Sequence, residues 1–156
     1  MGKYIIKEVT YIMKLVIGSD HGGYTMKKEI IEHFQKRGIE IVDVGTDSPE
    51  SCDYPVYAKK LTDILTAGEA DLGILICGTG IGMSMAANKV DGIRAALCHD
   101  VFSAEATRSH NNANVLCMGA RVIGAGLACM IADTFVDTPF SNDERHIRRI
   151  SMYSKL

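Results

Sequence analysis

The sequence predicts an α/β protein, with a parallel five-stranded sheet between two layers of helices in a Rossmann-like (flavodoxin-like) arrangement. From residue 15 onward, short apolar runs that are typical of buried strands alternate with stretches of helical period. Such repeated βα units favour a parallel sheet with helices on both of its faces. The length of 156 residues and the hydrophobic content of 47% suit one domain, residues 1–156, with a buried core.

The first βα unit is expected between residues 15 and 37. Residues 15–19 form a short apolar run that is consistent with a buried strand. A helix is expected to begin near Thr25, because Met26, Ile30 and Phe34 then share one face, and Gly38 is a stop signal.

The second unit combines a strand expected at residues 40–44 with a helix expected at residues 55–67. A polar loop, residues 45–53, joins them. Pro55 suits the first helical turn, where its missing N–H group is not needed, and Gly68 suits the position just beyond the last turn.

The rest of the chain continues the alternation. Strands are expected at residues 72–77, 95–98 and 115–118, and helices at residues 81–89, 101–109 and 125–136. Ligands of parallel α/β sheets bind beyond the carboxyl ends of the strands, so the residues that follow each strand are the candidates for a site. Three clusters are expected at this edge, at residues 20–23, 77–82 and 98–100.

Composition argues against several classes of function. The net charge of −2 disfavours nucleic acid or an anionic membrane as the main partner. No apolar run reaches the roughly 20 residues of a membrane-spanning helix. Five cysteines stand at irregular positions without a C-x-x-C pair, which favours reduced thiols in the cytoplasm over a disulfide framework or a zinc site.

The first twelve residues precede the first strand and contain no candidate site residue. Lys7 and Glu8 interrupt their apolar residues, and no small-residue cleavage site follows, so a signal peptide is not expected. Residues 1–12 are predicted to be a disordered N-terminal extension or a tag remnant.

The most informative segment runs from Gly73 to Gly82. A buried-strand pattern leads into Cys77, and closely spaced glycines, including Gly78 and Gly80, follow before a helix begins. Such a turn directs backbone N–H groups toward one point at a helix N-terminus, where an anion is favoured. The G-x-G-x-G spacing differs from the dinucleotide fingerprint and the Walker lysine is absent, which argues against NAD and ATP. The alternative is a tight turn that only needs small residues.

Cys77 is the first candidate for chemistry, as a base that faces this loop. A free thiol has a pKa of about 8.5, which a helix N-terminus or nearby cations can lower. The alternative is a small buried hydrophobic residue. That alternative is favoured for Cys52, Cys117 and Cys129, and less strongly for Cys98.

Further candidates are histidines and arginines. His110 follows the helix expected at residues 101–109, where it is either a titratable acid or base or a helix cap. His21 is either an anion contact or a turn residue. Arg145 and Arg149, four residues apart, share a helical face that suits a phosphate dianion or forms a solvated basic helix end. Arg121 lies just beyond a strand end.

Together these residues resemble the ribose-5-phosphate isomerase B family, which includes the galactose-6-phosphate isomerase subunits. The resemblance extends from Lys14 to about Ile150. Its motifs, in chain order, are Gly18-Ser-Asp-His-Gly-Gly23, Gly45-Thr46, Asp53-Tyr-Pro55, Ile76-Cys-Gly-Thr-Gly-Ile-Gly82, Ala86-Ala-Asn-Lys89, Gly92-Ile-Arg-Ala95, His110-Asn111, Gly119-Ala-Arg-Val122 and Arg145-His-x-x-Arg149.

The resemblance implies that the chain interconverts ribose 5-phosphate and ribulose 5-phosphate through an enediolate, without a metal or cofactor. Cys77 is the implied base, supported by Thr79, and His110 is the implied group that opens the furanose ring. The implied substrate-binding residues are Asp20, His21, Gly78, Thr79, Gly80, Ile81, Gly82, Asn111, Arg121, Arg145 and Arg149.

The resemblance also implies a homodimer whose active sites are shared between the two chains, with a tetramer of such dimers as the alternative. One branch of the family has a glutamate after the glycine loop in place of the cysteine. Met83 stands at that position here, so the chain resembles the cysteine branch.

Two alternative functions remain open. The first is an isomerase of the same family for a six-carbon sugar phosphate, allose 6-phosphate or galactose 6-phosphate. The second, from another class, is a non-catalytic module that senses a phosphate or a nucleotide. Such a module needs the anion-binding loop but has no use for Cys77 and His110 together.

Overall fold

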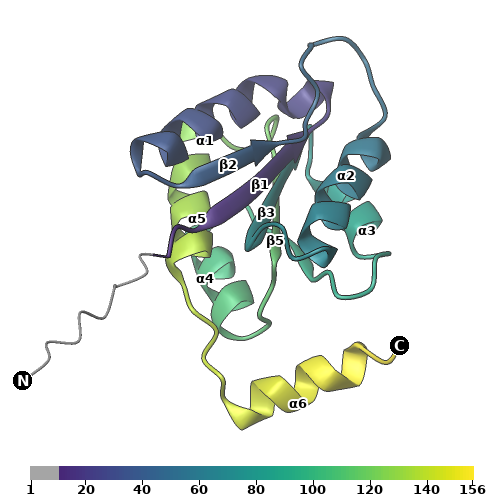
Figure 1. The fold of residues 1–156 in the computed structure, drawn as a ribbon, viewed down its shortest axis with the longest axis vertical. Coiled ribbons are helices and arrows are strands. Elements are labelled where there is room, and N and C mark those ends of the chain that lie inside the picture. Colours follow the sequence, from purple (N-terminus) through teal and green to yellow (C-terminus); the bar gives the residue numbers. More distant parts are fainter. Residues whose placement is uncertain (1–10) are drawn as a thin grey trace, which may run out of the picture.

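The computed structural model describes residues 11–156, which form a three-layer α/β/α structure (Figure 1). All five strands are parallel and belong to one sheet with the order β2-β1-β3-β5-β4. The strands are β1 (Lys14–Ser19), β2 (Glu40–Asp43), β3 (Leu72–Cys77), β4 (Ala95–Leu97) and β5 (Val115–Gly119). The predicted fold class is confirmed. The prediction for the N-terminal extension lies, for residues 1–10, outside the described residues.

The order of the last two strands differs from the 2-1-3-4-5 order of flavodoxin-like sheets. β5 lies between β3 and β4, and all five of its residues are buried. β4 forms the sheet edge and is shorter than predicted, although the N–H of Cys98 still donates to the carbonyl of Cys117. As a result, the carboxyl ends of β1, β3 and β5 are neighbours, and the turns that follow them meet.

Helices cover both faces of the sheet. The helices α1 (Tyr24–Lys36), α4 (Val101–Ser109) and α5 (Ala125–Asp137) pack on one face, and α2 (Tyr54–Thr66) and α3 (Ile81–Ala87) pack on the other. A 3-10 turn, η1 (His21–Gly23), precedes α1. α3 ends earlier than predicted because Asn88 caps it, and the Asn88 side chain exchanges two 2.9 Å hydrogen bonds with the backbone of Ala95.

The alternation of side chains along β3 decides which layer Cys77 faces. Ile74 and Ile76 point into the core beneath α1 and α5, whereas Leu75 and Cys77 point into the core beneath α2 and α3. The Cys77 thiol therefore lies between the end of β3 and the helix that follows it.

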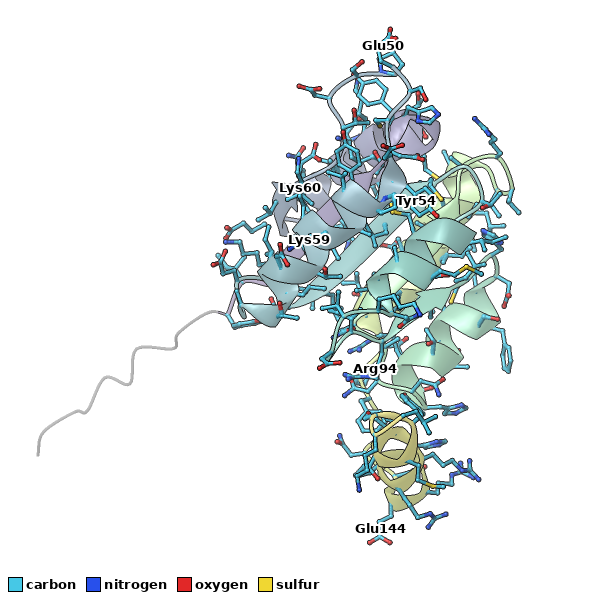
Figure 2. The ribbon with its side chains drawn as sticks, turned by 90° about the vertical axis from the view of Figure 1, so that its right-hand side faces the viewer. Glu50, Tyr54, Lys59, Lys60, Arg94 and Glu144 are labelled. Atoms are coloured by element: carbon cyan, nitrogen blue, oxygen red, sulfur yellow. The ribbon has the colours of Figure 1, made fainter. Side chains whose placement is uncertain are left out.

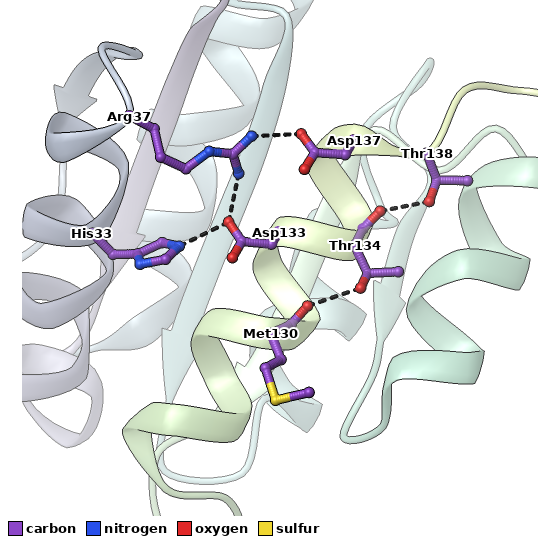
Figure 3. Close-up of polar contacts among 7 residues, drawn as sticks. All are labelled: His33, Arg37, Met130, Asp133, Thr134, Asp137 and Thr138. Atoms are coloured by element: carbon purple, nitrogen blue, oxygen red, sulfur yellow. Dashed lines mark hydrogen bonds and ion pairs between the residues drawn. The ribbon is translucent and has the colours of Figure 1, made fainter.

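A polar network holds α1 against α5 on the outside of the first layer (Figure 3). Arg37 donates to the carboxylates of Asp133 and Asp137, and Nε2 of His33 lies 2.7 Å from Oδ1 of Asp133. These carboxylates, Asp137 first, raise the pKa of the Arg37 guanidinium. The groups are about one-third exposed or more, so each pair contributes on the order of 1 kcal/mol or less.

The last helix, α6 (Glu144–Tyr153), lies apart from the three layers (Figures 1 and 2). It is found at the end of the molecule where the strands begin, opposite the loop that contains Glu50. None of the helices within residues 11–156 is long and apolar enough to cross a membrane.

Candidate active site

Three turns meet at the carboxyl edge of the sheet. A Cβ atom built on Gly22, after β1, would lie 3.0 Å from the backbone nitrogen of Gly78, after β3. One built on Gly119, at the end of β5, would lie 2.7 Å from the backbone of Thr79. The N–H group of Arg121 donates to the carbonyl of Gly78 at 3.0 Å. The turns are therefore in direct contact, and glycine is required where they touch.

Cys77 lies at the centre of this arrangement. Its side chain is buried, with 5% exposed, and its Sγ atom accepts the N–H of Gly80 at 3.1 Å. The positive φ of 76° at Gly80 folds the turn back over the sulfur, and a side chain at Gly80 would collide with Leu97 and Met118. The thiolate is the form of cysteine that accepts a proton, and an N–H donor at Sγ stabilises its charge.

Two other cysteines near this edge have different surroundings. Burial, with a contribution from Asp100, raises the pKa of Cys98 to about 11. Burial also raises the pKa of Cys117 far above its ordinary value, and neighbouring Cys77 and Cys98 add to that effect. Both therefore remain neutral thiols near pH 7, in agreement with the structural role expected for Cys117.

The glycine loop has fewer free N–H groups than its sequence suggests. The N–H of Gly80 donates to Cys77, and the N–H of Ile81 donates to Oγ1 of Thr79 at 3.3 Å. In the first turn of α3, helix geometry leaves the N–H groups of Gly82 and Met83 without intrahelical acceptors. The N–H groups of Gly80 and Ile81 therefore stabilise the side chains of Cys77 and Thr79, and the N–H groups at the start of α3 are the ones that can face an anion.

Asp20 and His21 follow β1 and border the same turn. Asp20 is 7% exposed, and its carboxylate accepts the N–H of Gly23 at 3.2 Å, which caps η1. Nδ1 of His21 accepts the N–H of Cys52 at 3.2 Å. A neutral His21 ring therefore carries its proton on Nε2, which makes no hydrogen bond to the residues that the structure describes and can donate to an anion.

Lys27 holds the loop after β2, which contains Cys52 and its N–H group. This role of Lys27 was not predicted from the sequence. The Nζ atom of Lys27, on a side chain that is only 3% exposed, donates to Asp43 at 2.9 Å and to the carbonyl of Thr46 at 2.7 Å. A signal was available in the helical period, because Lys27 falls on the same face as the core residues Ile30 and Phe34. A lysine on an apolar face needs a buried partner.

Arg121 and Tyr54 close the edge on two sides. The guanidinium of Arg121 lies over Gly78, where a built Cβ would be 3.3 Å from Nη1. Tyr54, which Figure 2 labels, is the first residue of α2. Its ring lies against Gly82, where a built Cβ would be 2.6 Å from Cζ. Tyr54 was not predicted as a site residue, since nothing in its local pattern shows that α2 and α3 touch there.

His99 and Asp100 have structural partners at this edge. Nε2 of His99 accepts the N–H of Gly119 at 3.0 Å. Asp100 caps α4 by accepting from the N–H of Ser103 at 2.7 Å and from its hydroxyl, and these bonds lower the pKa of its carboxyl. Within residues 11–156, no three His, Cys, Asp or Glu side chains come together in a way that could hold a metal ion.

The remaining candidates lie at the opposite edge. α4 begins at the carboxyl edge and runs back along the sheet, so its nine residues carry His110 about 13 Å away from that edge. There the His110 ring stacks on the ring of His146 in α6, and the hydroxyl of Tyr153 lies 3.4 Å from the carbonyl oxygen of Asn111.

One chain therefore contains two separate groups of predicted site residues. We call the first the carboxyl-edge set: Asp20, His21, Cys77, Gly78, Thr79, Gly80, Ile81, Gly82 and Arg121. We call the second the amino-edge set: His110, Asn111, Arg145 and Arg149. Each set is compact, and the length of α4 separates them.

The chain has close relatives of known family. A model of the family described as Ribose/Galactose Isomerase matches residues 15–153. Ribose-5-phosphate isomerase B of Escherichia coli is 47% identical over 137 residues, which are 88% of this chain and 91% of that protein. D-erythrulose-4-phosphate isomerase of Pectobacterium atrosepticum is 42% identical over 130 residues, 83% of this chain and 86% of that one. The chain also superimposes on the crystal structure of a ribose 5-phosphate isomerase from Thermotoga maritima, with a TM-score of 0.91 and 49% sequence identity. The superposition includes 94% of this chain and 100% of the Thermotoga maritima chain.

Proposed function

The chain belongs to the ribose/galactose isomerase family, and from this premise we propose that it interconverts D-ribose 5-phosphate and D-ribulose 5-phosphate. The observation that carries the proposal is the carboxyl-edge set itself. A buried cysteine with an N–H donor at its sulfur lies beside helix-start N–H groups and an arginine, which suits the transfer of a proton next to a developing oxyanion.

The chemistry that this geometry supports is a proton transfer between two neighbouring carbons. The Cys77 thiolate takes the proton from C2 of the open-chain aldose, and electrons move toward the C1 oxygen to form an enediolate. A proton then passes from the C2 hydroxyl to the C1 oxygen, which moves the negative charge to the C2 oxygen. The thiol returns its proton to C1 as the C2 carbonyl forms, which gives the ketose and restores the thiolate. N–H groups at the start of α3 stabilise the negative oxygen, and Thr79 holds the loop through its bond to Ile81.

Ring opening is assigned to His110 of the amino-edge set, and binding of the sugar and its phosphate is divided between the two sets. His110 moves the proton between the ring oxygen and the C1 hydroxyl, so that the furanose opens before proton transfer begins. Asp20 and Asn111 bind sugar hydroxyls. His21, Arg121, Arg145 and Arg149 bind the phosphate and nearby oxygens, for which arginine is suited by its paired N–H donors.

Because one chain keeps the two sets apart, we propose a homodimer in which each site takes its carboxyl-edge set from one chain and its amino-edge set from the partner. The apolar side chains of Met85 on α3, Leu97 on β4 and Phe102 on α4 are exposed around the edge strand and suit such an interface. The five free cysteines suit a reducing cytoplasm.

The shared site is tested by mixing two impaired variants, Cys77→Ala and Arg149→Ala, and assaying the mixture with ribose 5-phosphate far below the wild-type KM, where the weakened binding of Arg149→Ala lowers its rate. In a mixed dimer one site collects both defects and the other has none, so random mixing should restore about one quarter of wild-type activity, as follows from two-fold symmetry. Each variant refolded alone is the control. Confirmed mixed dimers without recovered activity would show that each site lies within one chain.

The substrate is tested by assaying wild-type protein against sugar phosphates of different length. Ribose 5-phosphate is expected to give the highest kcat/KM, ahead of allose 6-phosphate, galactose 6-phosphate and erythrulose 4-phosphate. The last is included because a relative of 42% identity carries that activity in its name. Isomerisation of none of these by a folded dimer would leave the phosphate-sensing alternative.

A further inference from the structure

α6 contacts the rest of the chain at His110, which is proposed to open the sugar ring, and at Asn111, which is proposed to bind a sugar hydroxyl. The imidazole rings of His110 and His146 are nearly parallel, with an angle of 9° between their planes and 4.5 Å between their centres. Tyr153, two turns further along α6, reaches the backbone of Asn111. One helix thus carries Arg145 and Arg149 and also supports His110 and Asn111.

His146 has no other described task. Its ring is buried, with 6% of the residue exposed, and Nε2 has no hydrogen-bond partner within residues 11–156. The nearest carboxylate oxygen, on Asp143, is 3.8 Å from Nε2, which is beyond hydrogen-bond distance. A buried polar atom without a partner costs free energy, so the ring is held in place by its stacked face.

The two rings differ in what they can reach. His110 is exposed at the end of α4 and is available to a substrate, whereas His146 is covered. Within the described part of the chain, the His110 ring makes no hydrogen bond, so its stack on His146 is the contact that fixes the plane of the ring. A general acid must present its nitrogen in a fixed direction to be effective.

We propose that His146 is a positioning residue, whose neutral ring face holds the His110 imidazole in the orientation needed for ring opening. The inference rests on the role of His110 in the proposed function and adds a residue to it. Burial, with the charges of Arg145, His110 and Arg149, lowers the pKa of His146 against the opposing effect of Asp143. A neutral His146 adds no positive charge next to the His110 ring.

The kinetic test compares His146→Ala, which removes the ring, with His146→Phe, which keeps a flat face and has no nitrogen. With ribose 5-phosphate, which is mostly cyclic, His146→Ala should lower kcat by about 10-fold to 100-fold, the range expected when a reacting group is misplaced. With ribulose 5-phosphate, which is already open, the loss should be several times smaller. His146→Phe should keep kcat near the wild-type value in both directions.

Two controls separate positioning from folding. In a His110→Ala background, adding His146→Ala should not lower kcat further, because the ring to be positioned is gone. If His146→Ala instead releases α6 as a whole, KM should rise through loss of Arg145 and Arg149 while the two substrates are affected alike. Either a fully active His146→Ala enzyme or a His146→Phe enzyme as impaired as His146→Ala would overturn the proposal.

A spectroscopic signature tests the stack without any activity. The carbon-bound ring protons of His110 should be shielded by the neighbouring ring in the NMR spectrum of the wild-type dimer and of His146→Phe, and should shift downfield in His146→Ala. If the signature is present but no sugar phosphate is isomerised, the stack holds and the proposed function fails. If the enzyme is active but the His110 signals do not respond to His146→Ala, the proposed function holds and this inference fails.

Discussion

The two sets of site residues are built on very different supports. The carboxyl-edge set lies on turns that follow three central, fully buried strand ends, and glycine backbones touch one another between these turns. The amino-edge set lies just beyond the end of α4 and on a peripheral helix, where stacked rings and one long hydrogen bond make the described contacts. The first support is a packed core, and the second is a surface attachment.

This difference matches the demands of the two tasks that are proposed for these sets. Proton transfer between carbons needs the base and the N–H donors fixed within a fraction of an ångström, which a close-packed sheet edge provides. Phosphate binding tolerates looser support, because long arginine side chains adjust to a dianion. Variants should therefore affect turnover at the carboxyl edge and mainly affinity at the outer helix, apart from His110.

The largest effect is expected at the base. Cys77→Ala should lower kcat by at least about 100-fold in both directions, within the range for loss of a general base, while KM changes little. Cys98→Ala is the matched control, since Cys98 is also a buried cysteine that follows a strand at this edge, and it should stay near wild-type turnover. Steady-state kinetics in both directions check this, and near-normal turnover of Cys77→Ala would rule out the assignment.

The next effect depends on which substrate is used. His110→Ala should lower kcat by about 100-fold with cyclic ribose 5-phosphate, at the lower end of the range for a positioned acid or base, and much less with open-chain ribulose 5-phosphate. Initial rates at saturating substrate in each direction measure the ratio. Equal losses in both directions would mean that His110 acts elsewhere than in ring opening.

A smaller effect is expected for the outer arginines. Arg149→Ala should raise KM by about 10-fold or more, because a hydrogen bond to a charged group contributes about 1.5–3 kcal/mol. Arg148→Ala, one position away on the same helix and outside the predicted set, is the control and should change KM less. If both raise KM equally, the helix contributes only general positive charge, and raising the salt concentration should remove both effects.

A pH-dependent change in stability is expected at the outer helix. Because the pKa of His146 is lowered in the folded chain, its folded form binds a proton less readily than the unfolded chain does. The stability it contributes is fully present above the unfolded pKa of about 6.5 and is lost as pH falls through the lowered folded pKa. The thermal midpoint of wild type should therefore fall relative to His146→Phe between about pH 7.5 and pH 5, and a constant difference between the two would contradict this.

The smallest effect concerns the N-terminal extension. Tyr11 is exposed and donates to Asp71, a contact that raises the pKa of its own phenol. Such a solvent-exposed contact contributes little to stability, so a chain that begins at Met13 should lose at most about 2–4 °C of thermal midpoint. Activity should be unchanged. A larger drop that Tyr11→Phe does not reproduce would mean that residues before Tyr11 stabilise the fold.

Local patterns in the sequence predicted most of the fold. All five strands and the helices that follow them lie within a few residues of their predicted ends, because apolar runs and stop signals act over short distances. The exchange of β4 and β5 could not be predicted, since which of two apolar runs is central depends on packing across the whole sheet. The full burial of β5 follows from its place between β3 and β4, and its apolar residues also favour that place.

The sequence predicted where the carboxyl-edge set lies in the fold, and it did not predict where the amino-edge set lies. The glycine loop around Cys77 can be recognised in the sequence, because its backbone geometry requires glycine at those positions. Nothing in His110 or Arg149 shows that they lie at the other end of the molecule, since helix direction and the placing of α6 arise from tertiary packing. The supporting contacts of Lys27 and Tyr54 were missed because they join segments that are distant in sequence.

The glycine contacts at the carboxyl edge also limit how the protein can be redesigned. A side chain at Gly23 would overlap the carbonyl of Ile76 at 2.3 Å, and one at Gly80 or Gly119 would press on backbone at 2.8 Å or less. These positions cannot be enlarged to admit or exclude a longer sugar. Laboratory evolution toward a new chain length should therefore accumulate its useful substitutions on α4 and α6, and leave the glycines untouched.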